Sequence, residues 1–305
     1  MHIIAVLNRD GGTFKTTDIE AFCAQAETVF GHHGHTIECR TVSGKTVAAE
    51  LRKAAGSAGV DAVLAGGGDG TISTAAGIAY ETGMPLAVLP AGTMNLFARA
   101  LKVPLELEAA LEALAAGELG RVDVATANGQ LFVHQFGVGI HARLVRIREG
   151  MAYRGRIGKM LASLRALGAV IVRPPVFEAE LHTPQGIVKR RVSGIAVSNN
   201  RVGDGHIPYA ERLDAGVLGI YVAEPMGMGE MVRLGCGILL GNWRSSPMVW
   251  EQEVEAITLR FPKRTRGARA VVDGELVPLE ATVELRSHAG ALPVLLPKQQ
   301  IDATS

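Results

Sequence analysis

Two glycine-rich turns carry the residues of this chain that are best suited to chemistry. They read GGGDGT at 66–71 and PAGTMN at 90–95, and each follows an apolar run and precedes a helix-like pattern. Glycine lets a ligand approach the backbone because it has no Cβ atom. The N–H groups of such a turn, and of the helix that follows it, attract anions such as phosphate. The two turns therefore predict a phosphate-binding edge of a parallel sheet.

Asp69 lies in the middle of the first turn, where it would repel a bare phosphate. Its presence makes chemical sense if it holds a Mg²⁺ ion that bridges phosphates, or if it binds a hydroxyl or a cation. A single turn of this kind is more often an ordinary tight connection, but two in succession favour a binding site. The turns fit neither the dinucleotide fingerprint G-x-G-x-x-G nor the P-loop pattern G-x-x-x-x-G-K-[ST].

Strand-like and helix-like segments alternate around these turns. Strands are predicted at 3–8, 35–42, 61–67 and 85–92, and helices around 17–32, 45–57, 71–82, 94–101 and 105–119. This alternation predicts a parallel sheet covered on both faces. After residue 121 the chain changes to short alternating runs broken by Gly, Pro and Asn, which predict an antiparallel sandwich or barrel. We expect an α/β domain at 1–121, a β domain at 122–287 and a tail at 288–305.

The composition of the chain indicates which binding partners and which cellular compartment to expect. A formal net charge of +1 gives no strong field, so nucleic acid is not an expected partner. The cysteines, Cys23, Cys39 and Cys236, are odd in number and lack CxxC spacing, which argues against disulfides and zinc and predicts small core residues in a reducing compartment. The first apolar run is too short for a signal peptide, and the apolar run at 231–241 is too short to cross a membrane. We expect a cytoplasmic protein, at most peripheral at the inner face of the membrane.

The motif GGGDGT together with PAGTMNLFAR resembles the catalytic domain of the diacylglycerol kinase family, which includes bacterial lipid kinases, sphingosine kinases and ceramide kinases. The resemblance extends to LNRDGG at 7–12, to the glycine-rich stretch at 198–222 and to VVDGELV at 271–277. It implies a Rossmann-like nucleotide-binding domain related to NAD kinase and phosphofructokinase, followed by an antiparallel β-sandwich. The family's active site is the cleft between the two domains, and its tail returns to the first domain.

The same resemblance implies transfer of the ATP γ-phosphoryl group to a lipid hydroxyl, with ATP and Mg²⁺ as cofactors. Asp69 would hold the nucleotide's Mg²⁺. The predicted nucleotide-binding residues are Asn8, Thr41, Gly66, Gly67, Gly68, Gly70, Thr71, Gly92, Thr93 and Asn95, and the predicted catalytic residues are Glu275, Asp273 and Asp123. Glu275 matches the family's proton acceptor. Taken alone, the DGE motif at 273–275 is more often a plain hairpin turn. Only the presence of GGGDGT in the same chain favours a catalytic role for it.

Three positions depart from the family's pattern. Leu96 stands where an acidic residue is frequent, and His141 replaces another frequently acidic position. Ala215 stands where the family's structural magnesium has an aspartate, and Asp214 lies one place earlier. We therefore predict no structural magnesium.

The lipid-facing surface is expected in the segment 224–250, which is rich in Met and Trp with Arg233 and Arg244 interleaved. Such a cluster is more often sandwich core. The basic runs at 143–159 and 262–269 could meet anionic head groups or form ordinary solvated faces. The sequence does not distinguish diacylglycerol, ceramide and sphingoid acceptors. A soluble-substrate kinase resembling NAD kinase and a non-catalytic lipid- or nucleotide-binding module stay open as alternatives, and a homodimer is an allowed assembly.

Overall fold

The computed structural model of the protein describes residues 1–149, 174–204 and 209–298. The chain divides into two compact units. Unit 1 comprises Met1–Val124 and the chain from Ala289 onward, and unit 2 comprises Ala125–His288. The chain passes between the units inside two strands, β5 (Glu118–Ala127) and β16 (Thr282–Leu296). The domain limits expected at 121/122 and 287/288 stay a prediction, because a division into compact units does not test where a functional domain begins.

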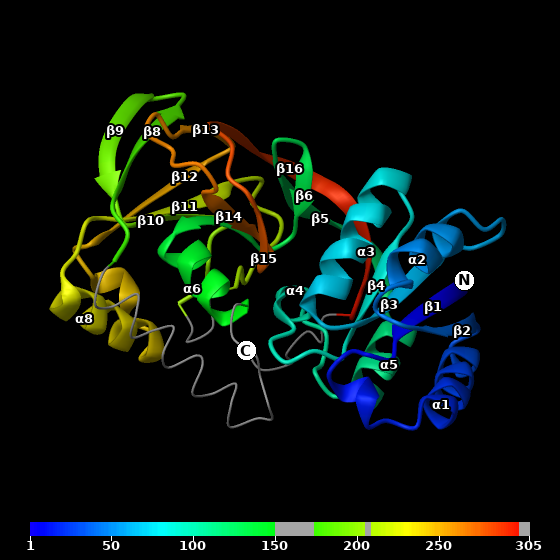
Figure 1. Cartoon of the computed structure of the whole chain (residues 1–305). Helices are drawn as coiled ribbons and strands as arrows, with labels where there is room; N and C mark the ends of the chain where they lie inside the picture. Colours follow the sequence, from blue (N-terminus) through cyan, green and yellow to red (C-terminus); the bar gives the residue numbers. More distant parts are fainter. Residues whose placement is uncertain (150–173, 205–208, 299–305) are drawn as a thin grey trace, which may run out of the picture. The chain divides into compact units, whose positions relative to one another are not determined.

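Unit 1 is built on a parallel sheet with helices on both faces (Figure 1). Its strands follow the order β2-β1-β3-β4, and the end of β16 lies parallel to β4. Helices α1 and α5 pack together on one face, and α2 and α3 pack together on the other. The strands are β1 (His2–Asn8), β2 (Thr36–Val42), β3 (Ala62–Gly67) and β4 (Leu86–Pro90), and the helices are α1 (Ile19–His32), α2 (Val47–Ala55), α3 (Asp69–Thr82), α4 (Leu96–Ala100) and α5 (Leu107–Ala115).

The central strands of unit 1 are buried on both faces, which explains why they read as continuous apolar runs. All residues of β3 and β4 are buried, and Ile3 to Leu7 of β1 are at most 1% exposed. Helix α3 begins directly after β3, and the short α4 begins a few residues after β4. The carboxyl ends of adjacent strands therefore carry the two glycine-rich turns.

Unit 2 is an antiparallel sandwich of two sheets. One sheet has the order β12-β11-β10-β7-β14-β15, and the other contains β16-β13-β8-β9 with β5 and β6 paired beside β16. The new elements are β6 (Gln130–Phe132), β7 (Gln135–Gly139), α6 (Ile140–Glu149), β8 (Phe177–Thr183), β9 (Gly186–Val192), β10 (Gly194–Asn199), β11 (Leu218–Ala223), α8 (Met228–Leu239), β12 (Val249–Val254), β13 (Ala256–Arg260), β14 (Arg269–Val272) and β15 (Glu275–Pro278).

The core of unit 2 lies between its two sheets. Buried side chains of both sheets form one cluster, with Phe132, Ile220 and Leu259 each fully enclosed. Helix α6 covers the other face of the first sheet, where Ala142 and Val145 pack on Val271. The predicted fold class, a Rossmann-like parallel α/β unit joined to an antiparallel β-sandwich, is confirmed.

Two local expectations were wrong, and one helix was not anticipated. The helix predicted at 105–119 ends at Ala115, because Gly117 turns against β16, where an added Cβ would lie 2.5 Å from the Leu296 carbonyl oxygen. The Met-rich segment contains helix α8, which the sequence did not predict. The cysteines are not core residues, since Cys236 is exposed and Cys23 and Cys39 are half-buried.

Candidate functional site

Three turns meet at the carboxyl edge of the unit 1 sheet. They follow β1, β3 and β4, and β3 lies between the other two strands. The first turn runs over 8–12, the second over 67–71 and the third over 90–95. Open α/β sheets bind ligands at this edge. Nine of the eleven residues predicted to bind the nucleotide or its Mg²⁺, all but Thr41 and Gly66, lie on these three neighbouring turns.

Glycines allow these turns to approach one another closely. An added Cβ on Gly12 would lie 2.6 Å from the Ala91 carbonyl oxygen, and one on Gly92 would lie 2.7 Å from the Gly68 Cα. Gly67 packs against Thr71, whose Cβ would be 2.7 Å from an added methyl group. Real Cβ atoms do not approach other atoms this closely, so the backbone arrangement requires glycine at these positions.

Asp69 links the second turn to the third. Its Oδ1 accepts a hydrogen bond from the Leu96 N–H at 2.7 Å, and its Oδ2 accepts one from the Asn95 N–H at 3.2 Å. The Asn95 side chain in turn accepts from the Gly92 N–H at 2.8 Å and donates to the Gly92 carbonyl oxygen at 3.1 Å. Asp69 therefore fixes the third turn, a task that the sequence did not suggest.

Asn8 links the first turn to the second. Its Nδ2 donates to the Thr71 hydroxyl at 2.9 Å, and both residues are buried. Its Oδ1 accepts from the Asp10 N–H at 3.1 Å, while the Asp10 carboxylate accepts from the Gly44 N–H at 2.8 Å. Asp10 was not predicted. The bond from its N–H to Asn8 is one that an asparagine in a turn commonly accepts, whereas the bond between its carboxylate and Gly44 joins residues 34 positions apart and has no local signal. Thr41 lies outside these turns, exposed near the end of β2.

The start of α3 carries the backbone N–H groups on which the predicted anion site depends. Helix α3 has 14 residues, its N-cap is Gly68, and no side chain caps its first N–H groups. Gly70 and Thr93 are exposed beside it. Uncapped N–H groups at a helix start, with the helix dipole behind them, suit a phosphate group. The residues present therefore fit a triphosphate, and Asp69, half-buried beside them, keeps lone pairs with which it could hold the accompanying Mg²⁺.

Asp123 belongs to unit 1, and its side chain is hydrogen-bonded to the backbone of that unit. It is 1% exposed, and its Oδ1 accepts from the Gly290 N–H of β16 at 2.7 Å. This bond ties β16 to β5. The position gives Asp123 a structural task in unit 1, beside the catalytic role that the resemblance implies.

Asp273 and Glu275 lie together in unit 2, on the hairpin that joins β14 to β15. Asp273 and Gly274 have φ angles of 46° and 88°, and Val272 pairs with Glu275 across the turn. Two positive φ angles in a two-residue loop define a type I′ hairpin, for which Asp-Gly is a preferred pair. The DGE motif is therefore a hairpin turn in structure, and this does not exclude a catalytic use of its side chains.

The two carboxylates of this hairpin differ in their surroundings. Asp273 accepts three backbone N–H bonds, from Val133 at 2.9 Å, His134 at 2.9 Å and Gln135 at 3.0 Å. Glu275 is exposed, and no hydrogen bond or ion pair engages it within the described chain. Asp273 therefore holds the hairpin against the β6–β7 connection, and Glu275 is the carboxylate that is available to a substrate.

The positions that depart from the family's pattern have other partners. Leu96 contributes its N–H to Asp69, and the Ala215 N–H donates to the Asn200 side chain at 3.1 Å. Asp214 pairs with Arg212 at 3.0 Å, and hydrogen bonds from this guanidinium lower the pKa of Asp214. Over residues 1–149, 174–204 and 209–298, no group of three or more His, Cys, Asp or Glu side chains could hold a metal ion.

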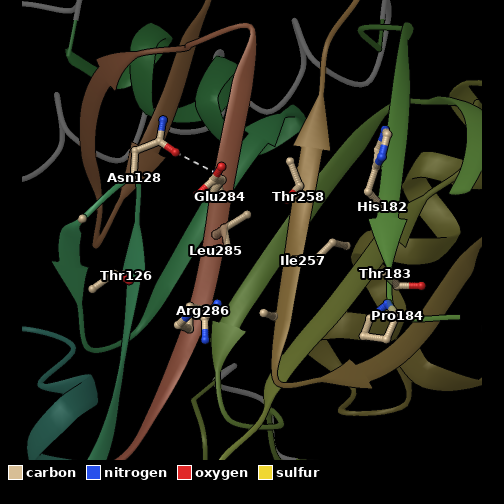
Figure 2. A pocket seen from close by; sticks show the side chains of 12 residues that line it. Thr126, Asn128, His182, Thr183, Pro184, Ile257, Thr258, Glu284, Leu285 and Arg286 are labelled. Carbon is tan, nitrogen blue, oxygen red and sulfur yellow. Dashed lines mark hydrogen bonds between the residues drawn. The ribbon is translucent and has the colours of Figure 1, made fainter. Parts of the chain in front are cut away.

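A hollow of about 370 Å³ lies on the outer face of the sheet of unit 2 that contains β16. Figure 2 shows the side chains that line it. Glu284, Thr258 and His182 lie side by side across β16, β13 and β8, and Arg286 lies two residues beyond Glu284. The Asn128 side chain accepts from the Glu284 N–H at 2.7 Å. Side chains of opposite charge on one open strand are typical of a solvated sheet face. The predicted site residues, all of which the structure describes, do not line this hollow.

The segment expected to face lipid is only partly an exposed surface. Met226 and Met231 are buried, Trp243 packs edge-on against Tyr221, and Trp250 lies under Arg190. Helix α8 nevertheless exposes apolar side chains, and Met228 and Val232 are 59% and 47% exposed. The basic run at 143–159 lies largely outside the described residues, as does 205–208 of the glycine-rich stretch. No helix in the described ranges has the length and apolar character needed to traverse a bilayer.

Comparisons with known proteins bear on the family and the fold of the chain. Residues 2–127 match the family model of the diacylglycerol kinase catalytic domain. An uncharacterized protein from Synechocystis sp. is 25% identical over 77% of this chain and 54% of its own length, and a diacylglycerol kinase from Staphylococcus aureus is 25% identical over 65% of this chain and 64% of its own. The chain thus spans about half to two thirds of the length of these relatives.

A solved structure of a diacylglycerol kinase from Bacillus anthracis superposes on 97% of this chain and on 97% of its own, with a TM-score of 0.70 at 17% identity. At this identity the likeness shows the fold. The resemblance first seen in the two glycine-rich turns is confirmed, because residues 2–127, which carry both turns, match the model of the diacylglycerol kinase catalytic domain.

Proposed function

We propose that this protein is a lipid kinase that transfers the γ-phosphoryl group of ATP to a lipid hydroxyl. The observation that carries the proposal is the meeting of three turns at the carboxyl edge of the unit 1 sheet, with the uncapped start of α3 among them. The family match of residues 2–127 and the kinase relatives support the same chemistry. The acceptor is proposed to be a lipid of diacylglycerol, ceramide or sphingoid type.

In this proposal the turns of unit 1 hold the nucleotide. The N–H groups of Gly68, Gly70 and Thr71 bind phosphate oxygens, and Thr93 offers a further donor. Mg²⁺ supplies charge neutralisation at the phosphates when it is bound, and Asp69 is the carboxylate placed to hold it. Asp69 also keeps the third turn in position, so one side chain orients both the ligand and the loop that surrounds it.

The hairpin of unit 2 supplies the groups for the acceptor. Glu275 accepts the proton of the lipid hydroxyl as that oxygen attacks phosphorus. Asp273 positions Glu275 by holding the hairpin through its three backbone N–H bonds. Asp123 acts from β5 by keeping β16 in place.

A membrane lipid as acceptor requires the protein to work at a membrane surface. We propose peripheral contact at the inner face of the membrane, with the exposed apolar residues of α8 as the contacting surface. A homodimer stays an open prediction.

Turnover with ATP, Mg²⁺ and a panel of acceptors tests the function. Mass spectrometry should detect a phosphorylated lipid in the presence of diacylglycerol, ceramide or a sphingoid base dispersed in vesicles. Phosphorylated NAD in place of a phosphorylated lipid would support the soluble-substrate alternative. Binding of nucleotide with no phosphorylated product from any acceptor would support a non-catalytic module.

A further inference from the structure

Unit 2 contains a second hollow, of about 430 Å³, that opens from the interior of its sandwich. Its lining comes from β7, from the start of β8, from β9 and from the loop between β13 and β14. Both sheets therefore contribute to it. Its volume lies in the lower part of the range for small-molecule sites, about 300–1,000 Å³, which suits one hydrocarbon chain better than two.

The inner wall of this hollow is apolar and continuous with the core. Val138, Phe261 and Leu279 line it and are at most 6% exposed. The Phe177 ring, whose centroid lies 6.1 Å from that of Phe261, forms another part of the wall. Val176, which is 44% exposed, also lines the hollow. A hydrocarbon chain would gain from burial against these side chains.

The polar lining of the same hollow carries an excess of positive charge. Arg191, Lys263 and Arg264 contribute three cations, and Glu178 contributes the one carboxylate among the lining residues that the structure describes. Lys263 pairs with Glu178 at 2.7 Å, and Arg264 donates to the Leu279 carbonyl oxygen. Arg191 is exposed, and within the described chain no acceptor engages its guanidinium. A neutral lipid would leave the Arg191 guanidinium without a counter-charge, whereas a carboxylate or phosphate would supply one.

We propose that this hollow binds a single-chain anionic amphiphile, with the hydrocarbon chain against Phe177, Phe261 and Leu279 and the acidic head group at Arg191. The acceptors of the proposed kinase reaction are uncharged (diacylglycerol, ceramide) or cationic (a sphingoid base), so this site holds a lipid of a different charge class. The proposal does not depend on catalysis. It also assigns a task to part of the basic run at 262–269.

Binding to the purified full chain tests the proposal with three amphiphiles that share an oleoyl chain. Oleate and oleoyl-lysophosphatidic acid are anionic, and monoolein is uncharged. Isothermal titration below the micelle concentration should give one site, with an anionic ligand binding at least roughly tenfold more tightly than monoolein. The preference between oleate and lysophosphatidic acid identifies the head group. Equal binding of monoolein would overturn the proposal.

Two variants and a matched control locate the site. Arg191→Gln removes the unpaired charge and should reduce the preference for the anionic ligands several-fold. Ala268→Phe fills the hollow from the β13–β14 loop and should abolish binding of all three ligands. Arg266→Gln, an exposed arginine of the same loop that does not line the hollow, should bind like the original protein.

If Ala268→Phe does not fold, Val176→Asp replaces it, because this side chain is exposed and an added carboxylate would repel an anionic head group. Loss of affinity in Arg266→Gln equal to that in Arg191→Gln would show unspecific attraction to basic loops and would reject the site. Unchanged affinity in Arg191→Gln and in Val176→Asp would reject it as well.

Discussion

Asp69 has two tasks in unit 1, as proposed ligand of Mg²⁺ and as observed acceptor for the third turn. Asp69→Asn removes the charge and leaves one side-chain oxygen, so the amide Nδ2 would face either the Leu96 or the Asn95 N–H. We expect ATP turnover to fall by at least roughly 10²-fold. The free energy of unfolding should also fall, by about 1–3 kcal/mol. Turnover and thermal unfolding should both be measured.

Asp61→Asn is the matched control. Asp61 accepts the His2 N–H at 2.7 Å, at the opposite edge of the same sheet. Asparagine keeps one oxygen that can accept this single bond, so the substitution removes a carboxylate charge far along the strands from the turns and should leave both stability and turnover nearly unchanged. Normal turnover in Asp69→Asn would reject its role in binding the metal.

Substitutions of Glu275 and Asp273 distinguish a catalytic base from a residue that holds the hairpin in place. Glu275→Gln keeps shape and removes basicity, so kcat should fall by roughly 10²-fold or more while the melting temperature stays the same. The assay must be run where chemistry limits turnover. A normal kcat under these conditions would move the base to another carboxylate.

Asp273→Asn should lower stability more than kcat, the reverse of the effect expected for Glu275→Gln. Asparagine tolerates the positive φ of 46°, but it cannot accept all three N–H bonds of the β6–β7 connection with one oxygen. We expect a loss of about 1–3 kcal/mol in unfolding free energy, with a smaller effect on kcat than Glu275→Gln. A melting temperature equal to that of the unchanged protein would show that the three N–H bonds to Asp273 do not stabilise the hairpin.

The close approach of the turns of unit 1 requires glycine at their contacts. One glycine in these contacts and one outside them should respond oppositely to substitution by alanine. Gly92→Ala would place a methyl group 2.7 Å from the Gly68 Cα and 2.8 Å from the Asn95 Oδ1, so the second and third turns must separate. Nucleotide affinity and melting temperature should both fall. Gly77→Ala, in the middle of α3, meets nothing within 4 Å and should stabilise the protein by about 0.5–1 kcal/mol with unchanged affinity. Equal effects of the two substitutions would contradict close packing of the turns.

The elements of unit 1 could be predicted from the sequence because buried parallel strands read as continuous apolar runs bounded by turns. Helix α8 could not, since the three glycines within it lower its helix propensity. The glycine-rich turns were predicted as a site from local pattern alone. The bonds from Asp69 to Leu96 and from Asp273 to Val133 join residues 27 and 140 positions apart, and no local pattern encodes such pairs.

Charge and apolar surface together bear on how the whole molecule would meet a membrane. A net charge of +1 provides little long-range attraction to an anionic bilayer. Contact must then depend on local apolar surface, and α8 exposes Met228 and Val232 one turn apart. Binding to vesicles is therefore expected to persist at about 0.5 M salt, where the Debye length is only a few Å.

Val232→Glu tests this contact, because it places a charge in the exposed apolar row of α8 without removing a buried side chain. Burial of a valine side chain contributes about 1.5–3 kcal/mol. The partition coefficient of Val232→Glu between buffer and vesicles, measured by sedimentation, should therefore be roughly tenfold lower than that of the unchanged protein. The matched control is Ile187→Glu, which makes the same kind of change at a residue of β9 that is 61% exposed. It should bind vesicles like the unchanged protein. If both variants lose binding equally, or if salt alone releases the unchanged protein, the contact is electrostatic or lies elsewhere, and α8 is not the surface that meets the membrane.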